Sequence, residues 1–215
     1  MFNLIKRNLY LHKMTIIIYM MLLFVLPIYN YFKEDYEVWF TPIFIIIFII
    51  GIIDAAHAYR IFKHFGHDEA YLFHHSLPVS KQQLLNAHYI TVILLTVFSA
   101  IVIFSYNHQD FISFNNIKLD FIWIFLASNL FIFMIYFPTS TEQSRNRRDA
   151  MIVYIIGMMF AIPFFIAMCA VLIGLFVFHN PNQFAHYHFD VYYFVVSVLT
   201  AIGTYIYHSI RNQRA

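Results

Sequence analysis

Histidine is the residue type best suited to chemistry in this chain, which contains 12 of them. Several gather in two groups: His64, His67, His74 and His75 in the first, and His179, His186 and His188 in the second. Imidazole binds zinc, copper and iron. No H-E-x-x-H motif occurs, and the spacings differ from the histidine boxes of membrane di-iron enzymes. We expect no metal site, with a membrane-embedded metalloenzyme using the first group as the alternative.

Asp54 is the acidic residue embedded in a long apolar run, from about residue 40 to residue 58. A charged side chain at membrane depth is costly and is a candidate for function. His57 follows three residues later and would lie beside Asp54 on a helix. Two interpretations stay open: a local pair that fixes the depth of the helix, or a group that contacts a substrate or carries a proton.

Motifs for binding phosphate are absent from the sequence. The five glycines are too far apart for GxxxxGK[ST] or GxGxxG, and there is no G-x-S-x-G sequence. The single cysteine, Cys169, lies in an apolar run, so the chain has neither a disulfide nor a cysteine metal site. We expect a protein that is not an enzyme and binds no cofactor itself.

Long apolar runs must position these residues. The chain is 61% hydrophobic and 11% charged, whereas soluble domains carry about 25% charged residues. Several runs reach the roughly 20 residues that span a bilayer as a helix. We predict an all-α polytopic membrane protein, one domain over residues 1–215 with six transmembrane helices. The predicted spans are 14–29, 40–58, 87–106, 121–137, 150–178 and 191–208, the fifth kinked near Pro163.

The positive charges are distributed unevenly about these spans. Of the 13 lysines and arginines, only Lys33 and Lys118 fall on the side opposite the termini. The other eleven are Lys6, Arg7, Lys13, Arg60, Lys63, Lys81, Arg145, Arg147, Arg148, Arg211 and Arg214. The positive-inside rule then predicts cytoplasmic termini, cytoplasmic loops at residues 59–86 and 139–149, and a multi-pass protein of the bacterial plasma membrane.

Residues 1–13 precede the first span and have moderate amphipathic character. Phe2, Ile5 and Leu9 share one helical arc, whereas Lys6 and Arg7 lie mostly off it. This pattern predicts a helix lying on the anionic cytoplasmic leaflet. Leu4 and Leu11 depart from the pattern, and a basic leader that only sets orientation is the alternative.

The longest polar interruption is GHDEAYLFHHSLPVS, residues 66–80. Asp68 and Glu69 stand where a helix N-terminus favours negative charge, and Pro78 disfavours helix in the residue before it. Ser80 and Gln83 have the spacing of a capping box. We predict a short amphipathic helix on the cytoplasmic side, followed by the capped start of a long helix.

This layout resembles the permeases of type-2 ABC exporters. The motif is the SLPVS turn, residues 76–80, followed by Lys81, Gln82 and Leu84, between the second and third spans. About fifteen residues carry the motif, whereas the architecture corresponds over the whole chain. More loosely, the chain resembles the small membrane subunits of phenol-soluble modulin exporters, which move amphipathic peptides. Many relatives have a larger outer structure between spans five and six.

The resemblance implies a permease subunit of an ATP-driven exporter for amphipathic peptides or lipid-like substrates. ATP and Mg²⁺ would bind a separate cytoplasmic ABC ATPase subunit, in two copies, and a second six-span permease chain would complete the path. The lipid bilayer is a further partner, and we expect no nucleic acid. The coupling helix that contacts the ATPase would include Asp68, Glu69, Tyr71, Leu72, Phe73, His74, His75, Leu77 and Pro78. A non-transporting immunity or regulatory membrane protein shares this architecture.

Overall fold

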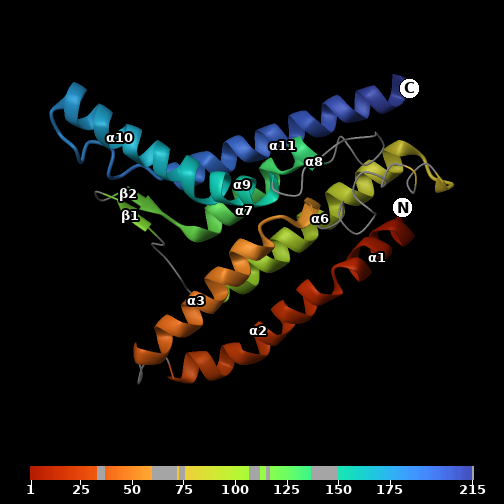
Figure 1. The fold of residues 1–215 in the computed structure, drawn as a ribbon, viewed down its shortest axis with the longest axis horizontal. Helices are drawn as coiled ribbons and strands as arrows, with labels where there is room; N and C mark the ends of the chain where they lie inside the picture. Colours follow the sequence, from red (N-terminus) through yellow and green to blue (C-terminus); the bar gives the residue numbers. More distant parts are fainter. Residues whose placement is uncertain are drawn as a thin grey trace.

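The computed structural model describes residues 1–32, 37–59, 72, 76–106, 112–114, 117–136 and 150–214. Helices dominate the described residues, as predicted (Figure 1). They are α1 (Phe2–Leu11), α2 (Lys13–Phe32), α3 (Glu37–Asp54), α6 (Lys81–Ser105), α7 (Phe121–Phe131), α8 (Phe133–Tyr136), α9 (Ala150–Ile156), η3 (Gly157–Ala161), α10 (Ile162–Phe178) and α11 (Phe189–Arg214). A short antiparallel hairpin, β1 (Ile112–Phe114) with β2 (Ile117–Leu119), lies where only a loop was expected.

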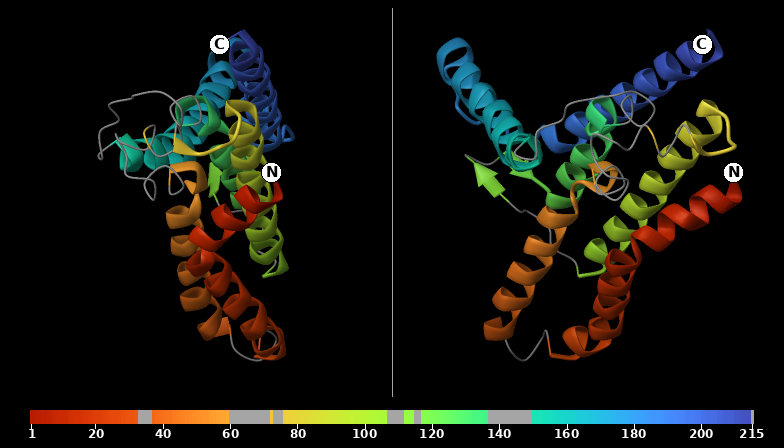
Figure 2. Two further views of the ribbon diagram at one scale, coloured as in Figure 1. Left: turned by 90° about the vertical axis from the view of Figure 1, so that its right-hand side faces the viewer. Right: turned by 45° about the vertical axis from the view of Figure 1, so that its right-hand side comes forward.

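The helices form two groups that meet along α6. On one side α1, α2 and α3 contact α6, and on the other side α7 and α11 contact it. Figure 2 shows α2 and α3 extending away from the rest of the molecule, while α11 runs past α7 and α8. The two termini lie toward the same end of the molecule (Figures 1 and 2).

The number of membrane spans is confirmed in part. Three helical stretches of the described chain are long and apolar enough to cross a bilayer: Lys81–Ser105, Ile152–Phe178 and Phe189–Gln213. A fourth exists if α1 and α2, bent by 70° from each other, count as one broken span. The apolar stretches Ile45–Asp54 and Phe121–Phe131 are shorter, and a turn at residue 132 separates α7 from α8. Six spans therefore remain a prediction.

The helix boundaries differ from the predicted ones at α6 and α11. The capping box is confirmed, because Ser80 Oγ accepts from the Gln83 N–H at 3.2 Å and Gln83 Oε1 accepts from the Ser80 N–H at 3.4 Å. With its first amides satisfied, α6 begins at Lys81, so the loop predicted at residues 59–86 ends in helix. The last helix, α11, continues to Arg214, six residues beyond the end predicted for the sixth span.

The irregularity expected near Pro163 takes the form of a π-helical turn. η3 joins α9 to α10, and the N–H of Ile162 bonds to the carbonyl of Gly157. Proline lacks the N–H that would continue an α-helical ladder, and its ring clashes with the carbonyl four residues earlier. A wider turn just before it relieves that clash. The helix from Ile152 to Phe178 continues through it for 27 residues.

A compact turn links α10 to α11. His179 adopts a left-handed conformation with φ 54°, and the N–H of Asn180 reaches back to the carbonyl of Gly174 at 2.9 Å. A Cβ on Gly174 would stand 2.7 Å from the Asn180 oxygen, so only glycine permits this reversal. Asp190, at the start of α11, accepts from the backbone N–H of Asp120 at 3.1 Å, which ties this turn to the start of α7.

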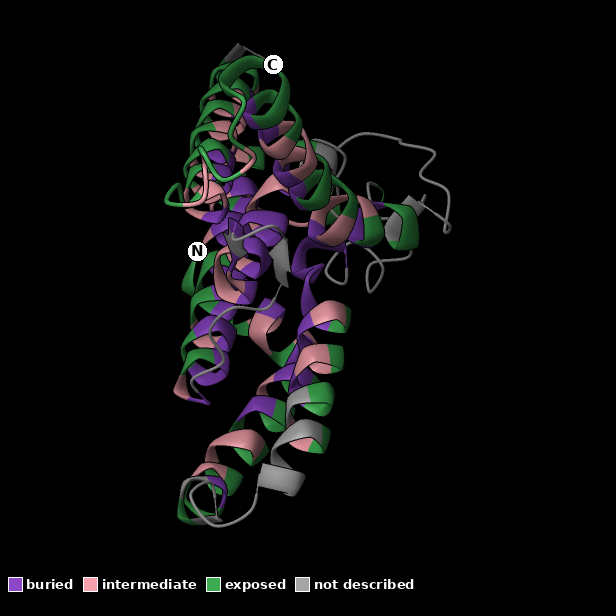
Figure 3. Cartoon of the chain, turned by 90° about the vertical axis from the view of Figure 1, so that its left-hand side faces the viewer, coloured by how far each residue is buried: buried purple, intermediate pink, exposed green. Residues whose placement is uncertain are grey.

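The buried residues concentrate where the helices of the two groups meet (Figure 3). On α6, Leu84, Val92, Leu95 and Ile103 are 2% exposed or less. Large apolar side chains also cover the outward faces, as in α10, where Phe176 is 73% exposed. Such apolar outer surfaces are expected of helices that face lipid.

Candidate functional site

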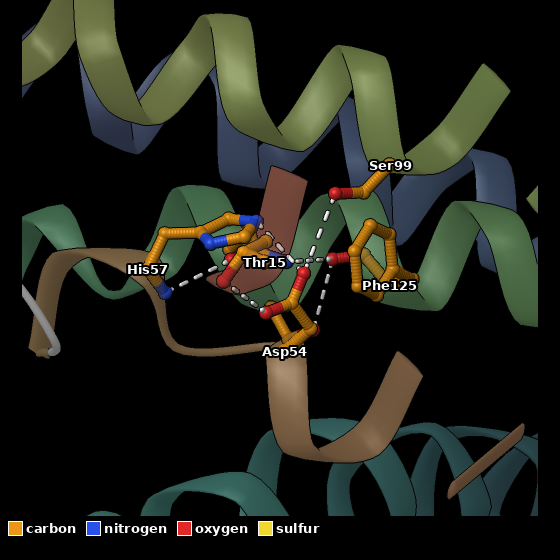
Figure 4. A network of polar contacts seen from close by, with 7 residues as sticks. Thr15, Asp54, His57, Ser99 and Phe125 are labelled. Atoms are coloured by element: carbon orange, nitrogen blue, oxygen red, sulfur yellow. Dashed lines mark hydrogen bonds and ion pairs between the residues drawn. The ribbon is translucent and has the colours of Figure 1, made fainter. Parts of the chain in front are cut away.

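A buried polar network surrounds Asp54, the last residue of α3, which is only 3% exposed. Its Oδ1 accepts from the Thr15 hydroxyl of α2 at 3.5 Å, and its Oδ2 accepts from the Ser99 hydroxyl of α6 at 3.4 Å. His57 Nε2 lies 3.5 Å from the same Oδ2. Figure 4 shows these side chains converging on the carboxylate from different elements. One acidic side chain therefore joins three helices.

The network extends from His57 to α7. The His57 backbone N–H donates to Asn129 Oδ1 at 3.5 Å, and Asn129 Nδ2 donates to the Phe125 carbonyl at 3.2 Å (Figure 4). The fully buried ring of His57 also meets the ring of His12 edge-on, with centroids 6.1 Å apart. The pair predicted between Asp54 and His57 is thus present, but it belongs to a larger set of contacts.

A second set of polar contacts attaches α1 to α6. His12 Nδ1 lies 3.0 Å from the Asn8 carbonyl, and Asn8 Nδ2 donates to the Thr91 hydroxyl at 3.4 Å. Asn8 is completely buried and Leu4 is 8% exposed, whereas Phe2 is 77% exposed. Residues 4, 8 and 12 therefore form the packing face, and the apolar arc predicted from Phe2 and Ile5 points elsewhere.

The chemistry available to the Asp54 network is that of a helix junction. The two carboxylate oxygens of Asp54 accept from two hydroxyl donors, and the His57 ring lies beside them as an ion-pair contact. Contacts of 3.4–3.5 Å are longer than the usual 2.7–3.0 Å, so each is weaker than a short hydrogen bond. These contacts hold α2, α3 and α6 in register and favour the interpretation of Asp54 as a group that fixes helix position.

A cavity of about 540 Å³ lies on the opposite flank of α6. Its walls come from α6, α7, α8 and α11: Asn86, Tyr89, Ile90, Ile93, Thr96, Val97, Leu126, Leu130, Phe133, Phe194, Val198, Ala201, Ile202 and Tyr205. The volume lies within the range of small-molecule sites, which are mostly apolar with few polar groups. Asp54 does not line it. Sequence reasoning missed this cavity.

One end of the cavity is polar and bridges α6 to α11. Asn86 Oδ1 accepts from the Tyr205 hydroxyl at 3.0 Å and from Gln82 Nε2 at 2.9 Å. Tyr89 stands beside this cluster and stacks on Phe133 of α8, with ring centroids 4.1 Å apart and planes 8° from parallel. The aromatic rings and the amide cluster define one end wall, while aliphatic side chains line the rest.

The predicted coupling helix falls mostly outside the described residues. Of its members, Asp68, Glu69, Tyr71, Phe73, His74 and His75 are not described, so their contact with an ATPase stays a prediction. Leu72 is 55% exposed, Pro78 is exposed and Leu77 is half-buried. Leu77 and Pro78 stand three and two residues before Ser80, the cap of α6.

The structure describes the second of the two histidine groups but not the first. The first group, residues 64–75, lies outside the described part of the chain. In the second, His186 and His188 are exposed, and His188 Nδ1 lies 4.0 Å from Asp190 Oδ1. Within the described ranges, no group of three or more histidine, cysteine or acidic residues is arranged to hold a metal.

Comparison with known proteins gives one family. No curated protein and no solved structure matches the chain. Residues 3–211 match the family described as ABC-2 family transporter protein. That match covers nearly the whole described fold, from α1 to the end of α11. The chain therefore belongs to the ABC-2 transporter family, as the membrane-embedded permease component of an ABC transporter.

Proposed function

We propose that this chain is the permease subunit of an exporter that moves amphipathic peptides or lipid-like molecules out of the cell. The observation that carries the proposal is the family match over residues 3–211. A permease of this family associates with an ATPase subunit and with a membrane. Export, rather than uptake, and the amphipathic substrate are the parts that we propose.

The geometry of α6 supports a mechanical link to the ATPase. The helix is capped by Ser80, one residue after the SLPV sequence, and continues for 25 residues, a length of about 37 Å. It contacts α1, α2, α3, α7 and α11. A displacement at the N-terminus of such a helix moves all of these contacts together, since helices with satisfied backbone bonds move as rigid units.

In the proposed cycle, closure of two ATPase subunits on ATP pushes the segment of residues 68–76 toward the membrane. The movement passes into α6 and alters its packing against α11 on one flank and against α2 and α3 on the other. A second permease chain, identical or different, would form the remainder of the path. The excess of lysine and arginine on the side of the termini supports placing this segment in the cytoplasm of a bacterial cell.

The test replaces two of the three apolar anchors proposed for the coupling helix, Tyr71, Leu72 and Phe73, as Leu72→Asp with Phe73→Asp. The wild-type chain and the variant are expressed with the ATPase subunit, and copurification is measured from detergent-solubilised membranes. We expect copurification and export to fall at least tenfold, because two carboxylates would have to be buried in an apolar cleft. Insertion into the membrane should persist.

The matched control is Tyr187→Asp, an exposed aromatic residue in the turn before α11. It should retain wild-type copurification, since it lies on the predicted outer side. If Leu72→Asp with Phe73→Asp also copurifies normally, the segment of residues 68–76 is not the coupling element. A chain that is stable in the membrane without any ATPase would instead fit the immunity or regulatory class.

A further inference from the structure

The cavity beside α6 contains a buried hydroxyl that the described residues leave without a hydrogen-bond partner. Thr96 lines the cavity, is 2% exposed, and its Oγ1 has no partner there. Threonine in a helix usually bonds back to the carbonyl four residues earlier, as Thr91 does to Ala87 at 2.7 Å. A buried hydroxyl without a partner is destabilising, because nothing replaces the hydrogen bonds to water that it has lost. A ligand that pairs with Thr96 would offset this destabilisation.

The residues that line the cavity also favour an uncharged occupant. Among the residues that the structure describes, none that lines the cavity is acidic or basic, and a charged group without a partner is strongly disfavoured in such surroundings. Asn86 and Tyr205 are polar lining residues at one end, where Asn86 also accepts from Gln82, and Thr96 lies further along. Asn86 and Thr96 are ten residues apart on α6, about 15 Å. The occupant is therefore uncharged, with hydrogen-bonding groups at both positions.

The contact between α6 and α11 limits the width of the occupant. Tyr205 of α11 hydrogen-bonds to Asn86 of α6 at 3.0 Å, and its ring lies 5.2 Å from that of Tyr89. A helix inserted between them would need axis separations of about 8–10 Å on each side, which these direct contacts forbid. An extended peptide would bury many unpaired backbone groups against the aliphatic walls. A single alkyl chain is narrower than a helix and has no backbone polar groups to leave unpaired.

The cavity opens toward the outer surface of the helices. Ile93 and Val97 of α6 and Ile202 of α11 line it, and they are 43%, 47% and 50% exposed. On an apolar outer surface, the molecules available to enter sideways are those of the bilayer. The open side therefore points to a lipid as the occupant.

We propose that the cavity between α6 and α11 binds an uncharged membrane lipid with a single alkyl chain. Its head group bonds to Asn86 and Tyr205, and a polar substituent part-way along the chain bonds to the Thr96 hydroxyl. This site goes beyond the proposed function, because its occupancy requires neither ATP nor transport.

The experiment uses the full chain in lipid nanodiscs with two photoreactive monoacylglycerols, one plain and one with a hydroxyl midway along the acyl chain. Labelled residues are identified by mass spectrometry, and affinity is obtained by competition with the unlabelled molecules. We expect saturable labelling of the cavity walls and about threefold to tenfold tighter binding of the hydroxylated probe, the effect of one hydrogen bond. ATPase copurification is scored separately, so a failure of the coupling proposal leaves this result interpretable.

Variants assign the effect to the cavity. Thr96→Val should remove the preference for the hydroxylated probe and leave binding of the plain one unchanged. Ala201→Trp, which fills the cavity from α11, should abolish saturable labelling by both. Thr204→Val is the matched control, because that hydroxyl already bonds to the Thr200 carbonyl at 2.8 Å outside the cavity.

Several results would overturn the proposal. These are labelling spread evenly over the exposed apolar faces, equal affinity for the two probes in the wild-type chain, or cross-links from the cavity to a second copy of the chain. Displacement of the probes by an amphipathic peptide but not by unlabelled monoacylglycerol would also overturn it. The competition in the wild-type chain decides the question even if Ala201→Trp fails to fold.

Discussion

The two long apolar helices α6 and α10 are similar in composition but are buried to very different extents. In the most apolar 18-residue stretch of α6, 61% of the residues are buried inside the protein. Only 22% are buried in the corresponding stretch of the helix that contains α10. Both are apolar enough to cross a bilayer. Since lipid tails are as apolar as leucine, apolar burial alone does little to bring helices together. The polar contacts and close approaches of α6 distinguish the two helices.

The largest expected effect compares two leucines at these helices. Leu95 of α6 is 2% exposed and Leu175 of α10 is 45% exposed. We expect Leu95→Ala to lower the free energy of unfolding by about 2–3 kcal/mol, because it opens a void among packed side chains. Leu175→Ala should change it by less than about 0.5 kcal/mol. Unfolding in mixed micelles measures both, and equal losses would show that α10 is as tightly packed as α6.

The next effect concerns the carboxylate that joins α2, α3 and α6. Asp54→Leu should cost about 2 kcal/mol, because two hydroxyl donors lose their acceptor, His57 loses the carboxylate beside it, and each such contact in a membrane protein contributes about 0.6 kcal/mol or more. Asp54→Asn keeps an acceptor oxygen and should lose less than half as much. The same unfolding measurement applies. A leucine variant as stable as the wild type would mean that the network contributes no stability.

A close approach between α3 and α7 gives the third prediction. A Cβ at Gly51 would stand 2.6 Å from Cζ of Phe121, whereas a Cβ at Gly203 of α11 would meet nothing within 4 Å. Gly51→Ala should therefore destabilise by about 1–2 kcal/mol through overpacking. Gly203→Ala should be neutral or slightly stabilising, because alanine favours helix. Comparable melting temperatures for the two variants would contradict the close approach.

The smallest effect tests the bond between α9 and α7. The Tyr154 hydroxyl donates to the Ser128 carbonyl at 2.6 Å. Tyr154→Phe removes one buried hydrogen bond and should cost about 1 kcal/mol. Tyr192→Phe is the control, since that residue is 56% exposed, and its unfolding should match the wild type.

Features that depend on neighbouring residues could be predicted from the sequence. The Ser80 and Gln83 cap needs only four consecutive residues, and the irregular turn before Pro163 follows from the missing proline N–H. Asp54 and His57 also lie near each other as expected. Each of these features depends on residues only a few positions apart, so contacts with distant parts of the chain have little effect on it.

Features that depend on distant residues could not be predicted. The prediction that Phe2, Ile5 and Leu9 face the membrane surface stays a prediction, but nothing in the sequence indicated that Leu4 and Asn8 on another face of α1 would be buried against α6. The cavity depends on Asn86 meeting Tyr205, 119 positions later. A single sequence contains no signal for such a pairing beyond a few polar residues in apolar runs. The six-span count depended on apolar length alone, and a turn at residue 132 interrupts one of those runs.

The most direct test of the central claim is the capture of the wild-type chain from native membranes with identification of whatever copurifies. The account predicts a soluble subunit with a GxxxxGK[ST] sequence that hydrolyses ATP and dissociates when residues 68–76 are altered. A purified chain that contains bound metal and no ATPase would contradict the account and favour the membrane metalloenzyme.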